Sequence, residues 1–370
     1  MGKIRIAVFC GGQSAEHDVS LASGKNIADA LDPVRYDITL IAIDRTGVMR
    51  LIPSIDELRK TALDKPIDVT AFKTHVALLR GLKGAEIIEV GTGKVIATPD
   101  VAFPILHGPY GEDGTIQGYL KFIGLPFVGP SVLGSAAGMD KDFTKRLLRD
   151  SGIAIGKFVT LQRDQQAEPA RARDFASLKK ELGLPFFLKP VNMGSSIGVY
   201  KVSDEAGFNK AIKDAFQYDT KVIIEEFIDG REIECAVIGN HKLAASPPAE
   251  IIPKHDFYSY EAKYLDENGA AIELPAKVSP AQADEFAKLA IRVCEVLECR
   301  GLSRVDFFLR KSDSKIFVNE INTLPGFTKI SMYPKMMGLT GRSYSGLIDE
   351  LVQLAIQRRE EEAGLKVTVV

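Results

Sequence analysis

Two acidic side chains interrupt an apolar stretch, VDFFLRKSDSKIFVNEIN at residues 305–322, which otherwise predicts a buried hairpin. Side chains alternate between the faces of a strand, so Glu320 and Asn322 share a face, and a three-residue turn at 312–314 places Asp306 opposite Glu320. Like charges in opposite positions of a sheet are unfavourable, which favours a bound cation here. Two carboxylates and an amide oxygen suit Mg²⁺, whose coordination is usually completed by substrate phosphates. The alternative is a solvent-facing hairpin end with scattered acids, which needs no metal.

A glycine- and serine-rich segment, FLKPVNMGSSIGV at residues 187–199, could hold phosphate groups. The chain contains neither the G-x-x-x-x-G-K-[ST] loop nor the G-x-G-x-x-G turn of other nucleotide-binding proteins. Here a strand would deliver Lys189, and the turn at residues 194–196 would direct backbone N–H groups and hydroxyls toward phosphate oxygens. The alternative is an ordinary flexible hairpin with a surface lysine.

The next strand, in KVIIEEFIDGREIE at residues 221–234, ends in two acids, Glu225 and Glu226. Backbone groups at such a strand end could face an adenine edge. Glu232 begins the following strand and could accept hydrogen bonds from ribose hydroxyls. The alternative is a solvated turn between strands, in which acids are unremarkable.

The bulk composition excludes several classes of function. The chain has 370 residues, which predicts two or three domains, and it is 45% hydrophobic and 26% charged, as is normal for a globular protein. Lys and Arg number 47 and Asp and Glu 49, so charge gives no reason to expect nucleic acid or an anionic membrane as a partner. No apolar run is long enough for a membrane span, the N-terminus lacks a signal-peptide core, and the four cysteines match no zinc or redox spacing. We therefore expect a cytoplasmic protein with free thiols.

The elements that position the candidate residues follow from apolar periodicity. In the first part of the chain, strands alternate with a helix, which predicts a parallel sheet with helices on both faces and ligands at the carboxyl ends of its strands. The expected strands are residues 4–9, 36–43 and 101–106, and the expected helix is residues 20–31. His107 directly follows the third strand and therefore lies at the carboxyl edge of this sheet.

A second unit is expected after the segment GLPFVGPSVLGS at residues 124–135, whose glycine, proline and serine content predicts a domain boundary. Residues 50–100 before it hold two short strands but no clear motif. The expected elements after the boundary are helices at 139–150, 175–182, 205–216, 281–297 and 345–361, strands at 158–161, 186–189, 198–202, 222–227 and 232–238, a loop at 253–270, and the hairpin described above.

Seven segments occur in the order in which they stand in D-alanine–D-alanine ligases, a family of the ATP-grasp superfamily. They are GGQSAEHDVS, LHGPYGEDGTIQGYL, MDKDFTK, LKPVNMGSSIGV, YSYEAKY, GLSRVDFF and NEINTLPGFT, and the resemblance runs from about residue 5 to the final helix. It implies a mixed α/β and α+β architecture, the ATP-grasp fold. The implied division is an N-terminal Rossmann-like domain with a parallel sheet at 1–129, a central ATP-grasp domain at 130–227, and a C-terminal catalytic domain at 228–370 with a mobile loop at 255–268. The last two domains would clamp ATP between α+β units.

The resemblance also implies the cofactors and the residues that hold them. The expected cofactors are ATP and two Mg²⁺ ions, for which Mn²⁺ can substitute, and the implied metal ligands are Asp306, Glu320 and Asn322. The implied ATP-binding residues are Lys141, Lys189, Gly194, Ser195, Ser196, Glu225, Glu226, Phe227, Ile228, Glu232 and Asn319.

The implied reaction joins two D-alanines for peptidoglycan precursor synthesis. Phosphoryl transfer from ATP to the first D-alanine makes an acyl phosphate, which the amine of the second D-alanine attacks, and the metal ions neutralise charge during the transfer. Arg304 and the backbone N–H of Gly326 match the family's donors to the oxyanion, and such donors are typically worth about 3–4 kcal/mol each. The implied catalytic residues are Glu16, Ser195, Tyr264, Arg304 and Gly326, and the implied substrate-binding residues are His107, Lys263, Ser331 and Met332.

Two details of the resemblance bear on the substrate and the assembly. Family members often carry leucine at the position of Met332, which keeps an apolar contact, and Tyr264 favours an amine over a hydroxyl as the second nucleophile. The family suggests a homodimer.

Two other functions are alternatives to a D-alanine–D-alanine ligase. The first is an ATP-grasp ligase for another D-amino or hydroxy acid, and the second is a noncatalytic ATP-binding protein. The second alternative predicts broken metal and oxyanion sites, whereas the residues for both are present.

Overall fold

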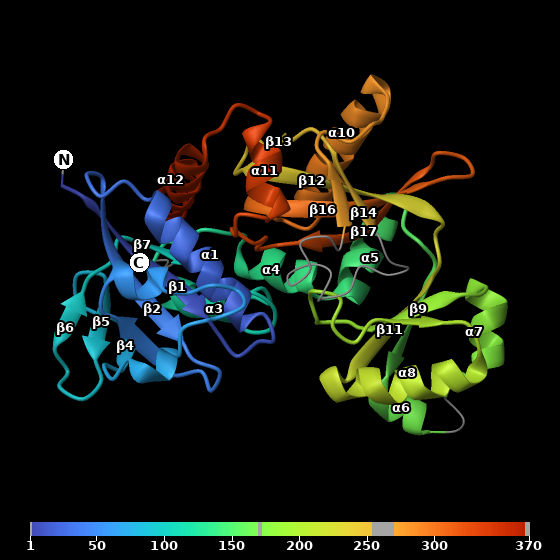
Figure 1. The fold of residues 1–370 in the computed structure, drawn as a ribbon, viewed down its shortest axis with the longest axis horizontal. Coiled ribbons are helices and arrows are strands. Elements are labelled where there is room, and N and C mark those ends of the chain that lie inside the picture. Colours follow the sequence, from blue (N-terminus) through green and yellow to red (C-terminus); the bar gives the residue numbers. More distant parts are fainter. Residues whose placement is uncertain (1, 169–171, 254–269, 367–370) are drawn as a thin grey trace.

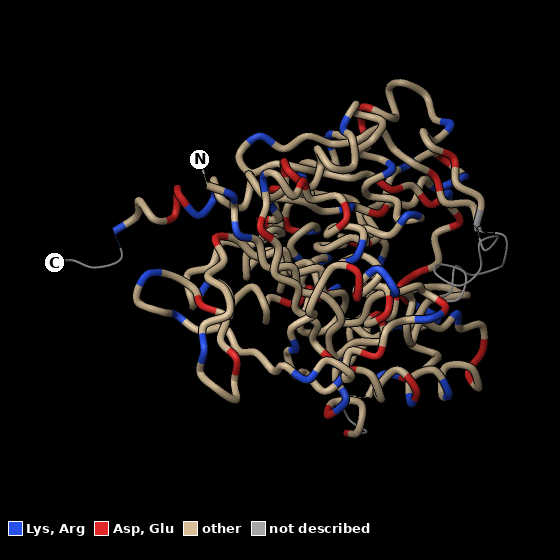
Figure 2. The backbone as a smooth tube through the Cα atoms, turned by 60° about the vertical axis from the view of Figure 1, so that its left-hand side comes forward, with Lys and Arg blue, Asp and Glu red and all other residues tan. Residues whose placement is uncertain are grey.

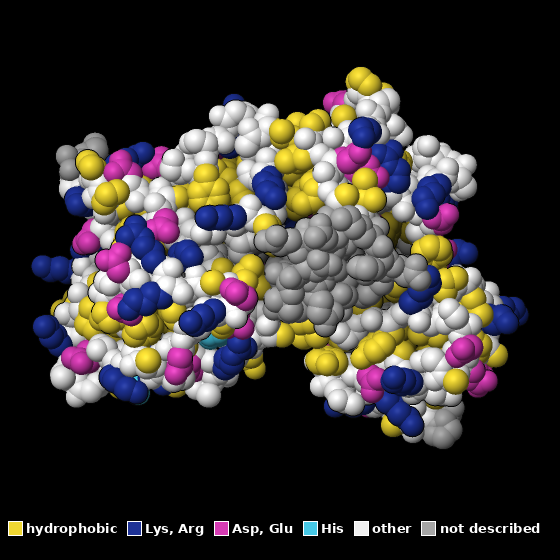
Figure 3. Space-filling model, viewed as in Figure 1, with side chains coloured by type: hydrophobic (Ala, Val, Ile, Leu, Met, Phe, Trp, Pro, Cys, Tyr) yellow, Lys and Arg dark blue, Asp and Glu magenta, His cyan; other side chains and the backbone are white. Residues whose placement is uncertain are grey.

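The computed structural model describes residues 2–168, 172–253 and 270–366 and contains three units with separate sheets (Figure 1). In this view the N-terminal unit lies at the left, the C-terminal unit at the upper right and the central unit at the lower right. A notch separates the N-terminal and central units at the lower edge of the molecule (Figure 3). Basic and acidic residues are interspersed along the whole backbone rather than gathered on one side (Figure 2). Within the described ranges, no helix is long and apolar enough to cross a membrane.

The N-terminal unit is built around a parallel sheet. Its elements are β1 (Ile4–Gly11), α1 (His17–Ala30), β2 (Tyr36–Ile43), β3 (Met49–Ile52), α2 (Ile55–Arg59), the 3₁₀ helix η1 (Val69–Ala71), β4 (Val76–Arg80), β5 (Ala85–Glu89), β6 (Val95–Ala97), β7 (Val101–Pro104) and α3 (Thr115–Phe122). The strand order is β3-β2-β1-β7, in which β1 is parallel to β2 and β7 while β3 is an antiparallel edge strand.

The central unit is an antiparallel sheet of the order β10-β9-β11-β8 with its own core of side chains from the sheet and two helices. Two further helices, α4 (Val132–Met139) and α5 (Lys141–Asp150), lead into it. Its elements are β8 (Phe158–Gln162), α6 (Arg163–Ala167), α7 (Phe175–Leu182), β9 (Phe186–Pro190), β10 (Tyr200–Val202), α8 (Glu205–Tyr218) and β11 (Lys221–Glu226). Asp174 and Asp204 cap α7 and α8 by accepting hydrogen bonds from backbone N–H groups of the first turn, which explains where these helices begin.

The C-terminal unit contains the largest sheet, of the order β15-β14-β12-β16-β17, with β13 paired to β12. Its elements are β12 (Gly230–Gly239), β13 (Ala244–Ala245), β14 (Ala249–Pro253), β15 (Ala270–Glu273), α10 (Pro280–Val296), β16 (Gly301–Arg310), β17 (Ile316–Asn322), α11 (Met332–Gly338) and α12 (Tyr344–Ala363). Helix α10 begins with a capping box formed by Ser279 and Gln282 and covers one face of the sheet.

One core is shared by the N-terminal and C-terminal units. Strand β1 is buried on both faces: Ile6 and Val8 belong to a core that includes α1, α11 and α12, whereas Ala7 and Phe9 belong to a core with α3 and the sheet β4-β5-β6. Phe327, which follows β17, joins the first of these cores. Helices on both faces of the sheet were expected, but one face carries a small antiparallel sheet beside its helix.

Most of the expected elements are present, and the exceptions are short. The expected helix at 139–150 is α5, which begins at Lys141 because Asp140 ends α4 and caps the N-terminus of α5. Helices α2, α3, α4, α6, α11 and η1 and strands β3, β6, β13, β14 and β15 were not expected. The expected loop at 253–270 is bounded by strand residues Pro253 and Ala270, and residues 254–269 lie outside the described ranges. The mixed α/β fold is confirmed, while the division of the chain at residues 129 and 227 remains a prediction.

Two helix glycines give a matched test of this packing. A Cβ at Gly24 of α1 would lie 2.7 Å from Cys10 Cβ of β1, whereas a Cβ at Gly118 of α3 would meet nothing within 4 Å. We expect Gly24→Ala to destabilise the protein by about 1–3 kcal/mol through overpacking. Gly118→Ala should stabilise it by up to about 1 kcal/mol, because alanine loses less backbone entropy in a helix. Thermal unfolding followed by circular dichroism measures both, and equal shifts for the two variants would contradict the close approach of α1 to β1.

Candidate active site

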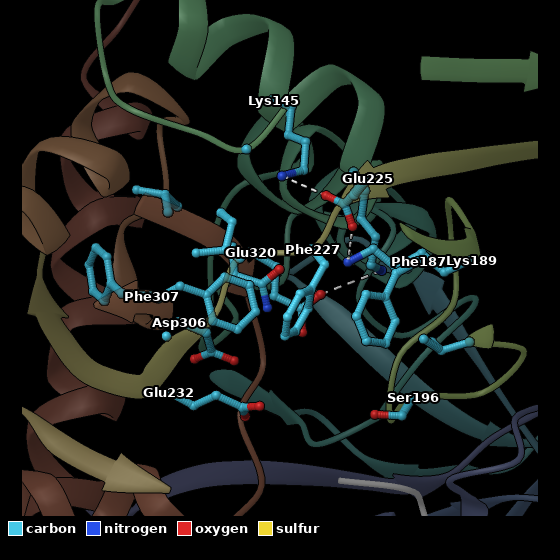
Figure 4. Close-up of a pocket in the computed structure, with 18 of the residues that line it drawn as sticks. Lys145, Phe187, Lys189, Ser196, Glu225, Phe227, Glu232, Asp306, Phe307 and Glu320 are labelled. Atoms are coloured by element: carbon cyan, nitrogen blue, oxygen red, sulfur yellow. Dashed lines mark ion pairs between the residues drawn. The ribbon is translucent and has the colours of Figure 1, made fainter. Parts of the chain in front are cut away.

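Two adjoining cavities lie where the three units meet. The first, of about 220 Å³, is lined by β9 and β11 of the central unit and by β12, β16 and β17 of the C-terminal unit (Figure 4). The second, of about 120 Å³, is lined by residues from the N-terminal unit, including Glu16 and His107, and by the segment after β17. Lys141, Glu234, Glu320 and residues 193–195 line both cavities, so the two spaces share a wall.

The hairpin of β16 and β17 brings its two acids together as predicted, but by a different route. Asp306 and Glu320 are directly opposite partners. The turn is one residue longer than expected, because Arg310 N–H donates to the Lys315 carbonyl at 3.0 Å. The register then shifts after Asp306, where Phe307 pairs with Val318, so Asn319 is the extra residue of a β-bulge. Bulges re-aim side chains, and Asn319 lines the first cavity as the sequence predicted for an ATP-binding residue.

A third acid continues this row across the sheet. Glu234 of β12 is the direct partner of Asp306, so Glu234, Asp306 and Glu320 lie side by side on three adjacent strands. Arg304 donates a two-pronged hydrogen bond to Asp306, from Nε to Oδ1 and from Nη2 to Oδ2, each at 2.7 Å. Burial lowers the pKa of Arg304, but Asp306 and Glu234 outweigh it and raise that pKa well above its ordinary value. The guanidinium is therefore charged and neutralises part of the row.

The predicted metal ligands suit magnesium in their chemistry. Asp306 and Glu320 are opposite one another, and Asn322 lies two residues beyond Glu320 on the same strand. Among the described residues no three His, Cys, Asp or Glu side chains are grouped so as to hold a metal ion by themselves. Two carboxylates and one amide match magnesium sites that phosphates complete, so the donor set fits a nucleotide-bound ion rather than a cage made of protein alone.

A buried carboxylate holds two lysines at one end of the first cavity. Glu225 of β11 makes ion pairs with Lys145 Nζ at 2.6 Å and Lys189 Nζ at 2.5 Å (Figure 4). Burial raises the pKa of Glu225, but the two lysines outweigh it and lower that pKa to about 2. Lys141, one turn before Lys145 on α5, donates to the Met193 carbonyl at 2.6 Å and lies 3.9 Å from Glu320. Three cations therefore converge where anionic phosphates would bind.

The remaining residues predicted to bind ATP lie around the first cavity. Phe187 and Phe227 stand with ring centroids 6.1 Å apart, and Lys201 Nζ lies over the Phe227 ring. Glu226 accepts a hydrogen bond from Lys157 N–H at 2.7 Å. The predicted residues that line this cavity are Lys141, Lys189, Gly194, Ser195, Ser196, Glu225, Glu226, Phe227, Ile228, Glu232 and Asn319.

The Gly/Ser loop reaches the second cavity. Ser195 and Ser196 have φ angles of 51° and 59°, in the left-handed region where non-glycine residues are strained. Such strain is common at ligand-binding loops, and here the Ser195 hydroxyl donates to the Glu16 carboxylate of the N-terminal unit. A Cβ at Gly194 would lie 3.0 Å from Glu16 Oε2, so the loop closely covers this carboxylate.

His107 ties the end of β7 to the segment that follows β17. Its Nδ1 lies 3.0 Å from the Leu324 carbonyl, which can only accept, so Nδ1 carries the proton. Burial lowers the pKa of His107, which favours the neutral ring. Gly326 lies close by, since a Cβ there would be 2.8 Å from Ser331 Oγ and 4.0 Å from His107 Nε2. The predicted residues that line the second cavity are Glu16, His107, Ser195, Arg304, Asn322, Gly326, Ser331 and Met332.

Three charged residues of the site were missed by the sequence analysis. They are Glu112, Lys145 and Glu234, all of which are buried. Glu112 accepts a hydrogen bond from Gly108 N–H at 2.7 Å, and burial together with Glu16 raises its pKa to about 8. Two of them could have been found from their spacing. Lys145 stands four residues after Lys141 and shares its face of a helix. Glu234 stands two residues after Glu232 and shares its face of a strand. Lys263 and Tyr264 lie outside the described residues.

Comparisons with known proteins identify the family of this chain. A family model described as the D-ala D-ala ligase N-terminus matches residues 5–130, and one described as the D-ala D-ala ligase C-terminus matches residues 147–353. A D-alanine–D-alanine ligase from Oceanobacillus iheyensis is 48% identical over 364 residues, which are 98% of each chain. The solved structure of a D-alanine–D-alanine ligase from Coxiella burnetii has a TM-score of 0.85 at 36% identity and covers 98% of this chain and 97% of that one. A D-Ala:D-Ser ligase from Enterococcus faecalis has a TM-score of 0.83 at 34% identity, with 96% and 100% covered. The chain therefore belongs to the D-alanine–D-alanine ligase family.

Proposed function

We propose that this chain is an ATP-dependent carbon–nitrogen ligase that joins two D-alanines into D-alanyl-D-alanine for peptidoglycan precursor synthesis and releases ADP. Membership of the family supports an enzyme of this class and its use of ATP. The observation that carries the proposal is the wall shared by the two cavities, to which Lys141, Glu320 and the Gly/Ser loop contribute. ATP in the first cavity and an amino acid in the second would meet at this wall.

The chain's own side chains account for the chemistry. A carboxylate is a poor electrophile at neutral pH, and transfer of the γ-phosphoryl group to the first D-alanine gives an acyl phosphate with a good leaving group. Lys141 and Lys189 supply positive charge beside the phosphates. Attack by the amine of the second D-alanine forms the new carbon–nitrogen bond, and phosphate departs. Arg304 and the backbone N–H of Gly326 donate hydrogen bonds to the oxyanion that forms on the way.

The substrate pocket follows from the second cavity. Glu16, held by Ser195, receives the ammonium group of the first D-alanine, and His107 lies beside it. Ser331 and Met332 hold the second D-alanine. The role that the family resemblance implies for Lys263 and Tyr264, the exclusion of water that would hydrolyse the acyl phosphate, concerns residues outside the described ranges. Residues 1–129, 130–227 and 228–370 serve as the three domains.

Asp306, Glu320 and Asn322 would hold magnesium, as two ions in this proposal, with Mn²⁺ as a substitute. Bound there, the ions would neutralise charge on the phosphate oxygens. The chemistry of this donor set supports the proposal.

The remaining ATP contacts are proposed for Glu225, Phe227 and Ile228 near the adenine and for Glu232 near the ribose. A cytoplasmic location and a homodimer are further expectations from the family, and light scattering against the chain mass of 40.4 kDa checks the latter.

A second candidate differs only in the acceptor. The structural likeness to a D-Ala:D-Ser ligase favours testing D-serine as the second substrate. A noncatalytic ATP-binding role is disfavoured, because Lys189, Arg304, Asp306, Glu320 and Asn322 all line the two cavities.

The first test is ADP release with magnesium and ATP in the presence of D-alanine, of L-alanine, of D-serine with D-alanine, or of no amino acid. We expect ADP release with D-alanine and a D-alanyl-D-alanine product identified by mass spectrometry. A mixed dipeptide as the main product would move the assignment to the second candidate. If no condition releases ADP although ATP still binds, the ligase proposal fails.

Competition between acceptors tests the role proposed for Tyr264. With D-lactate and D-alanine offered together at neutral pH, we expect the dipeptide to be the main product, because the family resemblance associates this tyrosine with an amine acceptor. An ester as the main product would overturn that role. The family match, which does not depend on Tyr264, would stand.

Glu225 tests the charge balance in the first cavity, where it pairs with two buried lysines. Glu225→Gln leaves Lys145 and Lys189 buried without their counter-ion, and we expect it to lower the free energy of unfolding by about 3–5 kcal/mol in urea at neutral pH. The control is Asp284→Asn, which removes an exposed ion pair with Lys288 and should leave the free energy of unfolding almost unchanged, because solvent screens this pair. Since the pKa of Glu225 falls from 4.5 to about 2 on folding, its contribution is present above pH 4.5 and is lost as the pH falls toward 2. Equal losses for the two variants would contradict a buried ion-pair network.

A further inference from the structure

Arg304 occupies a position between the nucleotide cavity and the substrate cavity. It lines the second cavity, while its partner Asp306 lines the first. Both oxygens of Asp306 accept hydrogen bonds from Arg304 in the two-pronged arrangement described above. The proposed function gives these residues different partners: Asp306 should bind a divalent cation, and Arg304 should face an oxyanion. One of them has to exchange partners before the reaction.

Glu234 is the side chain to which Arg304 can turn. Its Oε2 lies 3.3 Å from Arg304 Nε, and its side chain is 11% exposed. Glu234 is the direct cross-strand partner of Asp306, and Arg304 stands two residues before Asp306 on β16, so all three side chains share one face of the sheet. Glu234 also lines both cavities. A guanidinium that loses Asp306 therefore keeps a buried carboxylate beside it.

We propose that Glu234 is a positioning residue that holds Arg304 once Asp306 binds a divalent cation, and that Arg304 serves as the internal counter-cation of Asp306 until then. This inference rests on the proposed function. It deepens that function by linking cation binding at Asp306 to the position of Arg304, the oxyanion donor. While the guanidinium is still bound to Asp306, it competes with the cation for that carboxylate.

The strength of this competition can be measured with Mn²⁺ as the probe and saturating ADP in place of ATP, by electron paramagnetic resonance of free Mn²⁺ against a protein-free titration of Mn²⁺ with the same ADP. Arg304→Lys keeps the positive charge but loses the two-pronged geometry. We expect this variant to bind Mn²⁺ about tenfold more tightly than the native protein, the effect of one lost charge-assisted contact of this kind. Because charge is conserved, simple electrostatics predicts no change.

Arg310 supplies a matched control on the same strand. It makes the same two-pronged contact with Asp313, at 2.8 Å and 2.6 Å, at the exposed end of the hairpin. Arg310→Lys should leave the Mn²⁺ dissociation constant within twofold of the native value. A comparable tightening in both variants would show a general effect of the exchange and would overturn the competition at Asp306.

A double-mutant cycle tests Glu234 itself. In Glu234→Gln the guanidinium depends more strongly on Asp306, so the tightening caused by Arg304→Lys should be several-fold greater than in the native background. Equal effects in the two backgrounds would show that Glu234 does not hold Arg304. If Glu234→Gln weakens Mn²⁺ binding by the same large factor in both, Glu234 is a metal ligand and the positioning role is overturned. Glu234→Asp keeps the charge on a shorter side chain and repeats the test if the glutamine variant does not fold.

Steady-state kinetics supply the second readout. Arg304 acts on charge that develops during the reaction, so Glu234→Gln should lower kcat about tenfold or more while the KM values for ATP and D-alanine stay within about twofold. A change confined to KM would contradict the positioning role.

Failure of the inference can be distinguished from failure of the proposed function. If no form of the protein binds Mn²⁺, the metal site is overturned and the inference with it. If native protein and Arg304→Lys bind Mn²⁺ equally, the inference alone is overturned.

Discussion

The crowding of carboxylates on one face of the C-terminal sheet is the constraint on which the site depends. Glu234, Asp306 and Glu320 stand in adjacent positions of three strands, where their mutual repulsion is costly, and the side chains of Glu234 and Asp306 are largely shielded from water. The fold meets this cost with cations placed beside the three carboxylates. Arg304 is supplied by the middle strand, and Lys141 is supplied by α5. The same arrangement recurs at Glu225, where one carboxylate is held between Lys145 and Lys189. In such an arrangement a charged ligand can replace one member of an ion pair, because the ligand then balances the charge of the other member.

The sequence predicted the central pair of acids because alternation along a strand is a strong local rule. It could not predict the turn length and the bulge that bring the two acids opposite each other. The turn is lengthened by a local contact, in which Arg310 binds Asp313, and the bulge at Asn319 then restores the register. A bulge adds a residue without changing the apolar pattern around it, so periodicity cannot reveal one. Long apolar strands such as β2 were predicted with their full bounds, since burial on both faces leaves a continuous signal.

The missed parts of the site depend on partners from distant elements. Glu112 looks like an ordinary loop acid in the sequence, and only the fold shows that it is buried against Gly108 and close to Glu16. Lys145 and Glu225 are eighty residues apart in the chain, so nothing local marks them as an ion pair. The short helices α4 and α11 were not predicted from the sequence for a related reason. Small residues in α4 and a proline in α11 give weak helix signals, and packing against the rest of the protein decides their structure.

The distribution of cores has a consequence for how the site could open. The N-terminal and C-terminal units share one core, whereas the central unit has a core of its own. The walls of the second cavity that carry His107 and Gly326 are therefore fixed to each other, while the loop with Ser195 belongs to a separately packed body. A hinge between these bodies would widen the first cavity and lift Ser195 from Glu16 in the same movement, without breaking the bond from His107 to Leu324. The Ser195–Glu16 hydrogen bond thus joins two separately packed bodies across the second cavity.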